Sequence, residues 1–153
     1  MAELAYDRHA FETDGLVVEV KKLIMLETLV AHAYHAIDDA IDDHDTRAQL
    51  RTFGRTHERN ARALTRCLCW QAATGDSPEP QTSTEGVVGG LSPIMAMWHN
   101  EDEAARGYEE LLERPIREPH LERALTRGLE DARKHWAWLA LQAHPLARHQ
   151  ARA

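Results

Sequence analysis

Two glutamates, Glu27 and Glu101, each stand alone in a stripe of apolar residues. The first stripe advances by alternating steps of four and three: Leu16, Val20, Leu23, Glu27, Val30, Tyr34, Ile37 and Ile41. The second repeats this spacing later in the chain: Ile94, Met97, Glu101, Ala104, Tyr108 and Leu111. Such spacing is typical of the inward face of a helix in a bundle. Because an unpaired buried carboxylate is costly, a cation, a histidine, a metal ion or a proton must compensate each glutamate.

A tyrosine follows each glutamate two helical turns further along the same face. Tyr34 follows Glu27, and Tyr108 follows Glu101. The simplest explanation for this repeat is an internal duplication of a helix pair. We predict that the two hydroxyls orient the carboxylates, and ordinary core tyrosines with satisfied hydroxyls are the alternative.

Histidines and further polar residues occupy the middle of the other two helical segments. His57 and Asn60 interrupt the apolar stripe of the second segment, and His135 interrupts that of the fourth, with Asp131 one step to the side. Mid-height is the same level of a bundle whichever way a helix runs, so these side chains should meet the two glutamates in one polar layer. Carboxylates and imidazoles suit iron, manganese or zinc. The predicted metal ligands are Glu27, His57, Glu101, Asp131 and His135, surrounded by Tyr34, Asn60 and Tyr108.

Helical periodicity and capping residues predict four helices and almost no strand. The predicted helices span about 15–43, from just after Asp45 to about 74, from Ser92-Pro93 to about 113, and about 119–144. Asp45 and Ser92 are good N-caps, and a proline is favoured in the first helical turn. Gly75 should stop the second helix, and Pro145 should end the fourth.

The connections between these helices are unequal in length. Short links after the first and third helices predict two antiparallel hairpins. Residues 75–91 are rich in Gly, Pro, Ser and Thr, and when extended they reach roughly 55 Å, further than the roughly 42 Å length expected of the first helix. We therefore predict an all-α, antiparallel four-helix bundle over 14–144, two hairpins joined by a long crossover, with flexible termini at 1–13 and 145–153.

The pattern resembles the ferritin-like, diiron-carboxylate superfamily, and in particular its small bacterial members related to rubrerythrin. The resemblance covers about residues 16–142 and is most specific in Glu27-x6-Tyr34 and in the stretch from Glu101 to Tyr108. It implies a ferritin-like bundle with one ligand Glu on each of two helices and Glu-x-x-His on each of the others.

Two helices depart from that family pattern. The second reads His57-x-x-Asn60 where Glu-x-x-His is expected. In the fourth, the expected glutamate falls on Ala132, and Asp131 is a shorter, slightly rotated substitute. Both bridging carboxylates of a standard two-iron site are thus missing or altered.

Two functions from different classes follow. The first is a ferritin-like protein that binds iron, or else manganese or zinc; whether it also oxidises a redox-active metal with dioxygen stays open at this point. The second is a metal-free interaction or structural module, in which the glutamates pair with His57 and His135 as a buried layer that fixes the bundle register. The residues alone leave both open, and they do not settle whether the protein is an enzyme.

Composition excludes other classes. The net charge of −7 and the scattered basic residues argue against nucleic-acid binding. No stretch approaches a membrane span and the start lacks a signal-peptide core, so we expect a cytoplasmic protein.

Cys67 and Cys69 face different ways on a helix and should stay reduced. Trp136 and Trp138 also face different ways, which suggests a surface patch and a homodimer.

Overall fold

The chain folds into four long helices. The computed structural model describes the backbone of residues 3–71 and 92–150 and the side chains of 15–69 and 92–143. The elements are α1 (Glu3–Ala36), the 3-10 helix η1 (Asp38–Ala40), α2 (His44–Gln71), α3 (Pro93–Leu112) and α4 (Pro119–Gln150). These ranges contain no strand, which confirms the predicted all-α class. No helix in them is long and apolar enough to cross a membrane.

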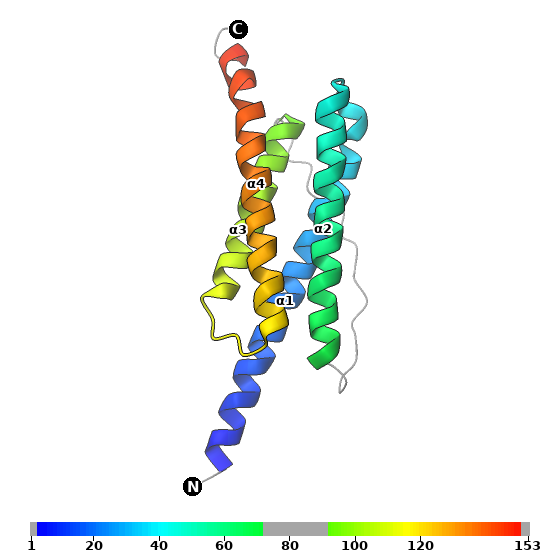
Figure 1. The fold of residues 1–153 in the computed structure, drawn as a ribbon. Helices are drawn as coiled ribbons and strands as arrows, with labels where there is room; N and C mark the ends of the chain where they lie inside the picture. The colour runs from blue at the N-terminus through cyan, green and yellow to red at the C-terminus, as the bar shows by residue number, and fades with distance from the viewer. Residues whose placement is uncertain (1–2, 72–91, 151–153) are drawn as a thin grey trace.

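The helices pack as a bundle (Figure 1). α1 packs against α2 and α3, and α4 packs against α3 and α2. In Figure 1 the chain runs in one direction along α1 and α4 and in the other along α2 and α3. The predicted crossover at 75–91 lies outside the described residues, as does Gly75, the predicted stop of the second helix.

Two apolar clusters fill the core, one on each side of a polar layer. One cluster includes Val20, Leu23, Leu64, Leu68, Tyr108, Leu111, Leu121, Leu125 and Leu129. The other includes Val30, Tyr34, Leu50, Phe53, Ile94, Met97, Leu139 and Ala143. The buried polar residues of the layer are Glu27, His57, Asn60, Glu101 and His135. Burial of the apolar clusters on every helix is what holds the polar layer at mid-height.

Local capping sets where α3 and α4 begin. The Ser92 hydroxyl accepts a hydrogen bond from the Met95 N–H at 3.3 Å, and proline follows directly, as predicted. The Glu118 carboxylate accepts hydrogen bonds from the backbone N–H groups of His120 and Leu121. These caps satisfy N–H groups that have no partner inside the first turn of a helix.

The cap predicted for α2 was wrong by two residues. Asp43, not Asp45, lies before the helix, and its carboxylate accepts the Thr46 N–H at 2.7 Å. The Asp43 carbonyl also accepts the Arg47 N–H at 3.0 Å. An N-cap side chain accepts the N–H two or three residues further on, and because α1 ends early, Asp43 lies outside it and can cap α2.

Three helix ends also differ from the sequence prediction. α1 ends at Ala36 instead of about residue 43, and Ile41, expected on its inward face, is extended and half-buried. Carboxylates oppose the negative end of a helix dipole, so the aspartates after Ala36 disfavour its continuation. α1 begins earlier than predicted, at Glu3, and α4 continues past Pro145 to Gln150. A proline removes one helical hydrogen bond, which can kink a helix without ending it. The flexibility of the termini stays a prediction.

Candidate metal centre

His57 lies between the two glutamates in the centre of the bundle. Its Nδ1 is 2.8 Å from Glu27 Oε2, and its Nε2 is 2.8 Å from Glu101 Oε1. Both glutamates are completely buried, and His57 is 1% exposed. The two carboxylates come from α1 and α3 and the imidazole from α2, so the three helices must be in register to form this contact.

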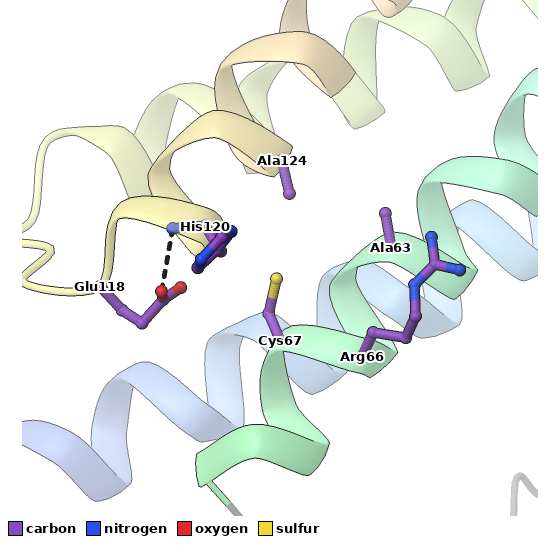
Figure 2. Close-up of a pocket in the computed structure, with 6 residues that line it drawn as sticks. All are labelled: Ala63, Arg66, Cys67, Glu118, His120 and Ala124. Carbon is purple, nitrogen blue, oxygen red and sulfur yellow. Dashed lines mark hydrogen bonds between the residues drawn. The ribbon is translucent and has the colours of Figure 1, made fainter.

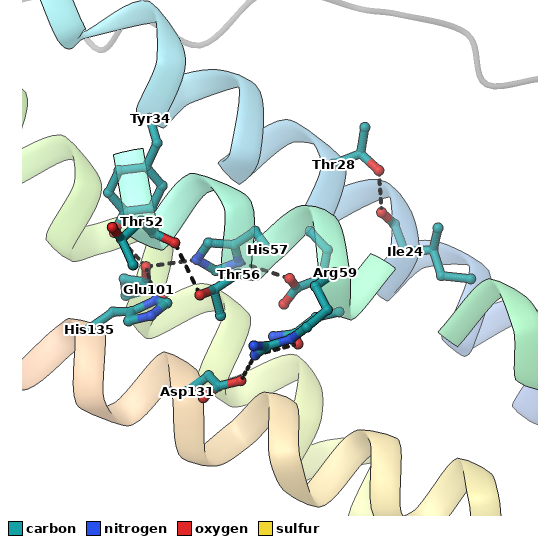
Figure 3. Close-up of polar contacts among 12 residues, drawn as sticks. Ile24, Thr28, Tyr34, Thr52, Thr56, His57, Arg59, Glu101, Asp131 and His135 are labelled. Atoms are coloured by element: carbon teal, nitrogen blue, oxygen red, sulfur yellow. Dashed lines mark hydrogen bonds and ion pairs between the residues drawn. The ribbon is translucent and has the colours of Figure 1, made fainter. Parts of the chain in front are cut away.

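Glu101 Oε1 is the meeting point of the layer (Figure 3). Besides His57, it accepts a hydrogen bond from the Tyr34 hydroxyl at 2.5 Å and one from His135 Nδ1 at 3.1 Å. The His135 ring stacks on Phe53, with ring centroids 3.9 Å apart. One oxygen atom therefore gathers side chains from α1, α2 and α4.

The carboxylates hold a proton on His57. Burial alone would lower the pKa of His57, but hydrogen bonds to Glu101 and Glu27 and the charges of both outweigh it and raise the pKa to about 10. Burial would likewise raise the pKa of Glu101, but hydrogen bonds from His135 and His57 and their charges lower it to about 2. At neutral pH His57 is thus an imidazolium that donates to both glutamates.

Each of the two tyrosines lies beside the glutamate of the other helix, not the glutamate of its own. Tyr34 of α1 donates to Glu101 of α3. Tyr108 of α3 lies near Glu27 of α1: burial first, and then the charge and polar contact of Glu27, raise the pKa of the Tyr108 phenol. The Tyr108 hydroxyl does not reach good hydrogen-bond geometry.

A glycine on α4 makes room for Tyr108. A Cβ atom added to Gly128 would overlap the end of the Tyr108 ring and its hydroxyl. Gly128 lies seven residues before His135, on the same face of α4, but its role could not be read from that position. The signal was a glycine in mid-helix, which usually has a packing reason.

Three oxygen atoms of the layer are buried without a hydrogen-bond partner: Glu27 Oε1, Glu101 Oε2 and the Tyr108 hydroxyl. An unsatisfied buried carboxylate oxygen is costly, so an orphan of this kind calls for an explanation. Carboxylate oxygens with free lone pairs beside two imidazoles match the donor set of a divalent cation.

Three of the five predicted ligands converge. Single ligand atoms of His57, Glu101 and His135 all lie within 4.8 Å of one another. Glu27 joins them through its hydrogen bond to His57. Asp131 lies to one side, where its carboxylate pairs with the Arg59 guanidinium at 2.6 Å.

Asn60 is buried in the layer and lies 3.4 Å from Arg59, which donates to its amide oxygen. Arg59 is half-buried, and it was not foreseen from the sequence, because nothing in its position distinguishes it from the other arginines of α2. The metal-binding roles of all five predicted ligands stay predictions, and so does the predicted place of Asn60 beside them.

A cavity of about 300 Å³ lies away from this layer, between α2 and the first turns of α4. The thiol of Cys67 points into it, beside Glu118 and His120 (Figure 2). Burial, followed by the charge of Glu118, raises the pKa of Cys67. The thiol form therefore dominates, which is typical of a structural and unreactive cysteine. Cys67 and Cys69 are both free, as predicted.

No protein-family model, curated protein or solved structure matches the chain. Its function must be argued from the polar layer itself.

Proposed function

We propose that this chain is a ferritin-like protein that binds a divalent metal ion, iron or else manganese or zinc, in the polar layer at mid-bundle. The supporting observation is the convergence of three ligands, His57, Glu101 and His135, carried by three different helices, within 4.8 Å. The orphaned Oε2 of Glu101 adds a further donor at the same place.

The spacing of the donors supports this fit. Ligand atoms that share a six-coordinate ion at about 2.1 Å lie roughly 3.0 Å apart. His57 Nε2 and His135 Nδ1 lie 2.8 and 3.1 Å from Glu101 Oε1. The hydrogen atoms that now join these donors are what a cation would replace, because ligands must be deprotonated to bind.

The chain's own residues hold, orient and shield the ion in this proposal. The two imidazoles and Glu101 bind it, Tyr34 fixes the Glu101 carboxylate, and the apolar clusters above and below exclude water. A bound redox-active ion supplies one-electron chemistry with dioxygen. We also propose that the protein is cytoplasmic. A homodimer is part of the proposal because Trp138 packs on the core while Trp136 is 37% exposed and could contact a second copy.

The second candidate is a metal-free structural module, favoured by the closed contacts of His57. Both ring nitrogens already have a carboxylate partner. A buried layer of this kind can specify register and orientation without any ligand.

Thermal melting distinguishes the two functions. The protein, stripped by a chelator, is melted with and without anaerobic ferrous ion, manganous ion or zinc, and bound metal is counted by elemental analysis. A ligand that binds only the folded state raises the melting temperature. We expect such a rise in the wild type and in the control Glu103→Gln, which changes an exposed glutamate of α3, the helix that carries Glu101. We expect no rise in His135→Gln. Admission of air to the ferrous sample should then produce the near-ultraviolet absorbance of ferric iron. A wild type whose melting temperature is unchanged by all three ions would rule out the metal-binding function and leave the structural module.

A further inference from the structure

We propose that the layer holds one metal ion, not two, and that Glu27 is a positioning residue for it instead of a ligand. This inference rests on the proposed function and assigns roles within it. Glu27 fixes the imidazole of His57 through Nδ1, and the opposite nitrogen, Nε2, faces the ion.

The two nitrogens of His57 have different surroundings. Nε2 lies 2.8 Å from Glu101 Oε1, the same oxygen that meets His135 Nδ1. Nδ1 lies on the other side of the ring and meets only Glu27 Oε2, at 2.8 Å. An ion bound by Glu101 and His135 can therefore reach Nε2 and not Nδ1.

A carboxylate that accepts a hydrogen bond from the far nitrogen of a ligand histidine is a common device at metal sites. It fixes the tautomer and the orientation of the ring and raises its basicity as a ligand. Glu27 is placed for this role, because its Oε2 accepts the Nδ1–H while the ring lies between it and the ion.

The ring of His57 also fills the place that a second ion would need. It separates the carboxylates of Glu27 and Glu101, which would have to share a second ion. Aromatic side chains hold the ring there: Tyr34 stacks on it, with centroids 5.6 Å apart, and His135 packs edge-on at 5.3 Å. Asp131, the other predicted carboxylate ligand, is engaged by Arg59.

The experiment counts ions and asks which nitrogen of His57 loses its proton. Stripped protein is titrated with zinc by calorimetry, and separately with cobalt(II), whose visible spectrum reports its ligands. Nitrogen-15 NMR of the histidine rings follows the zinc titration. Glu27→Gln keeps an oxygen that can accept the Nδ1–H but removes the charge, and Glu103→Gln is the exposed control on another helix.

We expect one zinc ion per chain. The Nε2 proton of His57 should disappear on zinc binding while the Nδ1 proton persists. Glu27→Gln should weaken zinc binding roughly 10- to 100-fold and leave the cobalt band positions and the stoichiometry unchanged, whereas Glu103→Gln should behave as wild type.

Several outcomes overturn this inference. Two ions per chain, loss of the Nδ1 proton, or a cobalt spectrum altered by Glu27→Gln would each make Glu27 a ligand or the site dinuclear. Equal zinc affinities for Glu27→Gln and Glu103→Gln would remove the positioning role. If Glu27→Gln does not fold, the wild-type NMR titration and the ion count still decide. A wild type that binds no ion overturns the proposed function as well, so the two failures are distinguishable.

Discussion

Raising the pH above 7 should destabilise the metal-free protein through a single buried proton on His57. The pKa of His57 is raised to about 10 in the folded protein from the ordinary value of 6.5, against the effect of burial, by its hydrogen bonds and charge interactions with Glu101 and Glu27. Because the folded-state pKa is the higher one, the folded protein holds one more proton than the unfolded chain between these values. The stabilisation is complete below the unfolded pKa and is lost as the pH rises towards 10.

The size of the effect follows from proton linkage. Each unit between the two pKa values is worth about 1.4 kcal/mol, so the free energy of unfolding should fall by about 2–3 kcal/mol between pH 7 and pH 9. The Glu101 carboxyl does not contribute in this range, because its pKa is lowered to about 2 and its stabilisation is lost only as the pH falls towards that value. The pKa values of Tyr34 and Tyr108 are raised by burial and nearby glutamates, which keeps both phenols neutral here.

Urea unfolding in the presence of a chelator, at several pH values from 6 to 9, measures this slope. His57→Gln should be less stable but nearly insensitive to pH over this range. His32→Gln, which removes an exposed histidine of α1, should keep the wild-type slope. A wild type whose free energy of unfolding is flat or rises from pH 7 to 9 would refute the conclusion that the layer holds a proton on His57.

Four further substitutions test other parts of the layer by urea unfolding of the metal-free protein. Gly128→Ala should cost about 1–3 kcal/mol, because its methyl group would overlap the Tyr108 ring in a packed core. Tyr34→Phe should cost about 1–3 kcal/mol by removing a hydrogen bond to the Glu101 carboxylate, whereas Tyr108→Phe should cost little or nothing, since that hydroxyl lacks a partner. Asp131→Asn should cost at most about 1 kcal/mol, as for a partly exposed ion pair, and should leave zinc affinity unchanged by calorimetry.

Control variants and contrary outcomes test each of these expected changes in the free energy of unfolding. Gly15→Ala places a methyl group in open space on a helix, so it should be neutral or stabilising by up to about 1 kcal/mol. A neutral Gly128→Ala would show that Tyr108 can move at no cost. Equal losses for Tyr34→Phe and Tyr108→Phe would contradict the assigned difference between the hydroxyls. A zinc affinity that drops in Asp131→Asn would restore Asp131 as a ligand.

Helical periodicity was enough to predict the polar layer. The seam spacing placed Glu27 and Glu101 inward, and both are fully buried. The position of His57 and His135 near the middle of their predicted helices put them at the same level as the glutamates, because mid-height is the same level whichever way a helix runs. These predictions needed only the rise and turn of a helix.

The finer contacts depend on quantities that one sequence does not contain. Which carboxylate a tyrosine reaches is set by the vertical offset between α1 and α3, so the crosswise pairing of Tyr34 with Glu101 was not predictable. The capture of Asp131 by Arg59 depends on how far a long side chain extends between α2 and α4. The early end of α1 was missed because apolar periodicity continues through Ile37 and Ile41 after the backbone has left the helix.

Each helical hairpin contains a histidine and a glutamate that contact each other, one on each of its two helices. Glu27 and His57 belong to α1 and α2, and Glu101 and His135 belong to α3 and α4. A hairpin that folds first can therefore partner its buried carboxylate locally, with no charge left unmatched in the partly folded chain. The Tyr34 and His57 contacts to Glu101 can form only when the two hairpins meet. The layer therefore contains two kinds of contact: a His–Glu pair within each hairpin, and contacts of Tyr34 and His57 with Glu101 Oε1 that require the two hairpins to dock in the correct register.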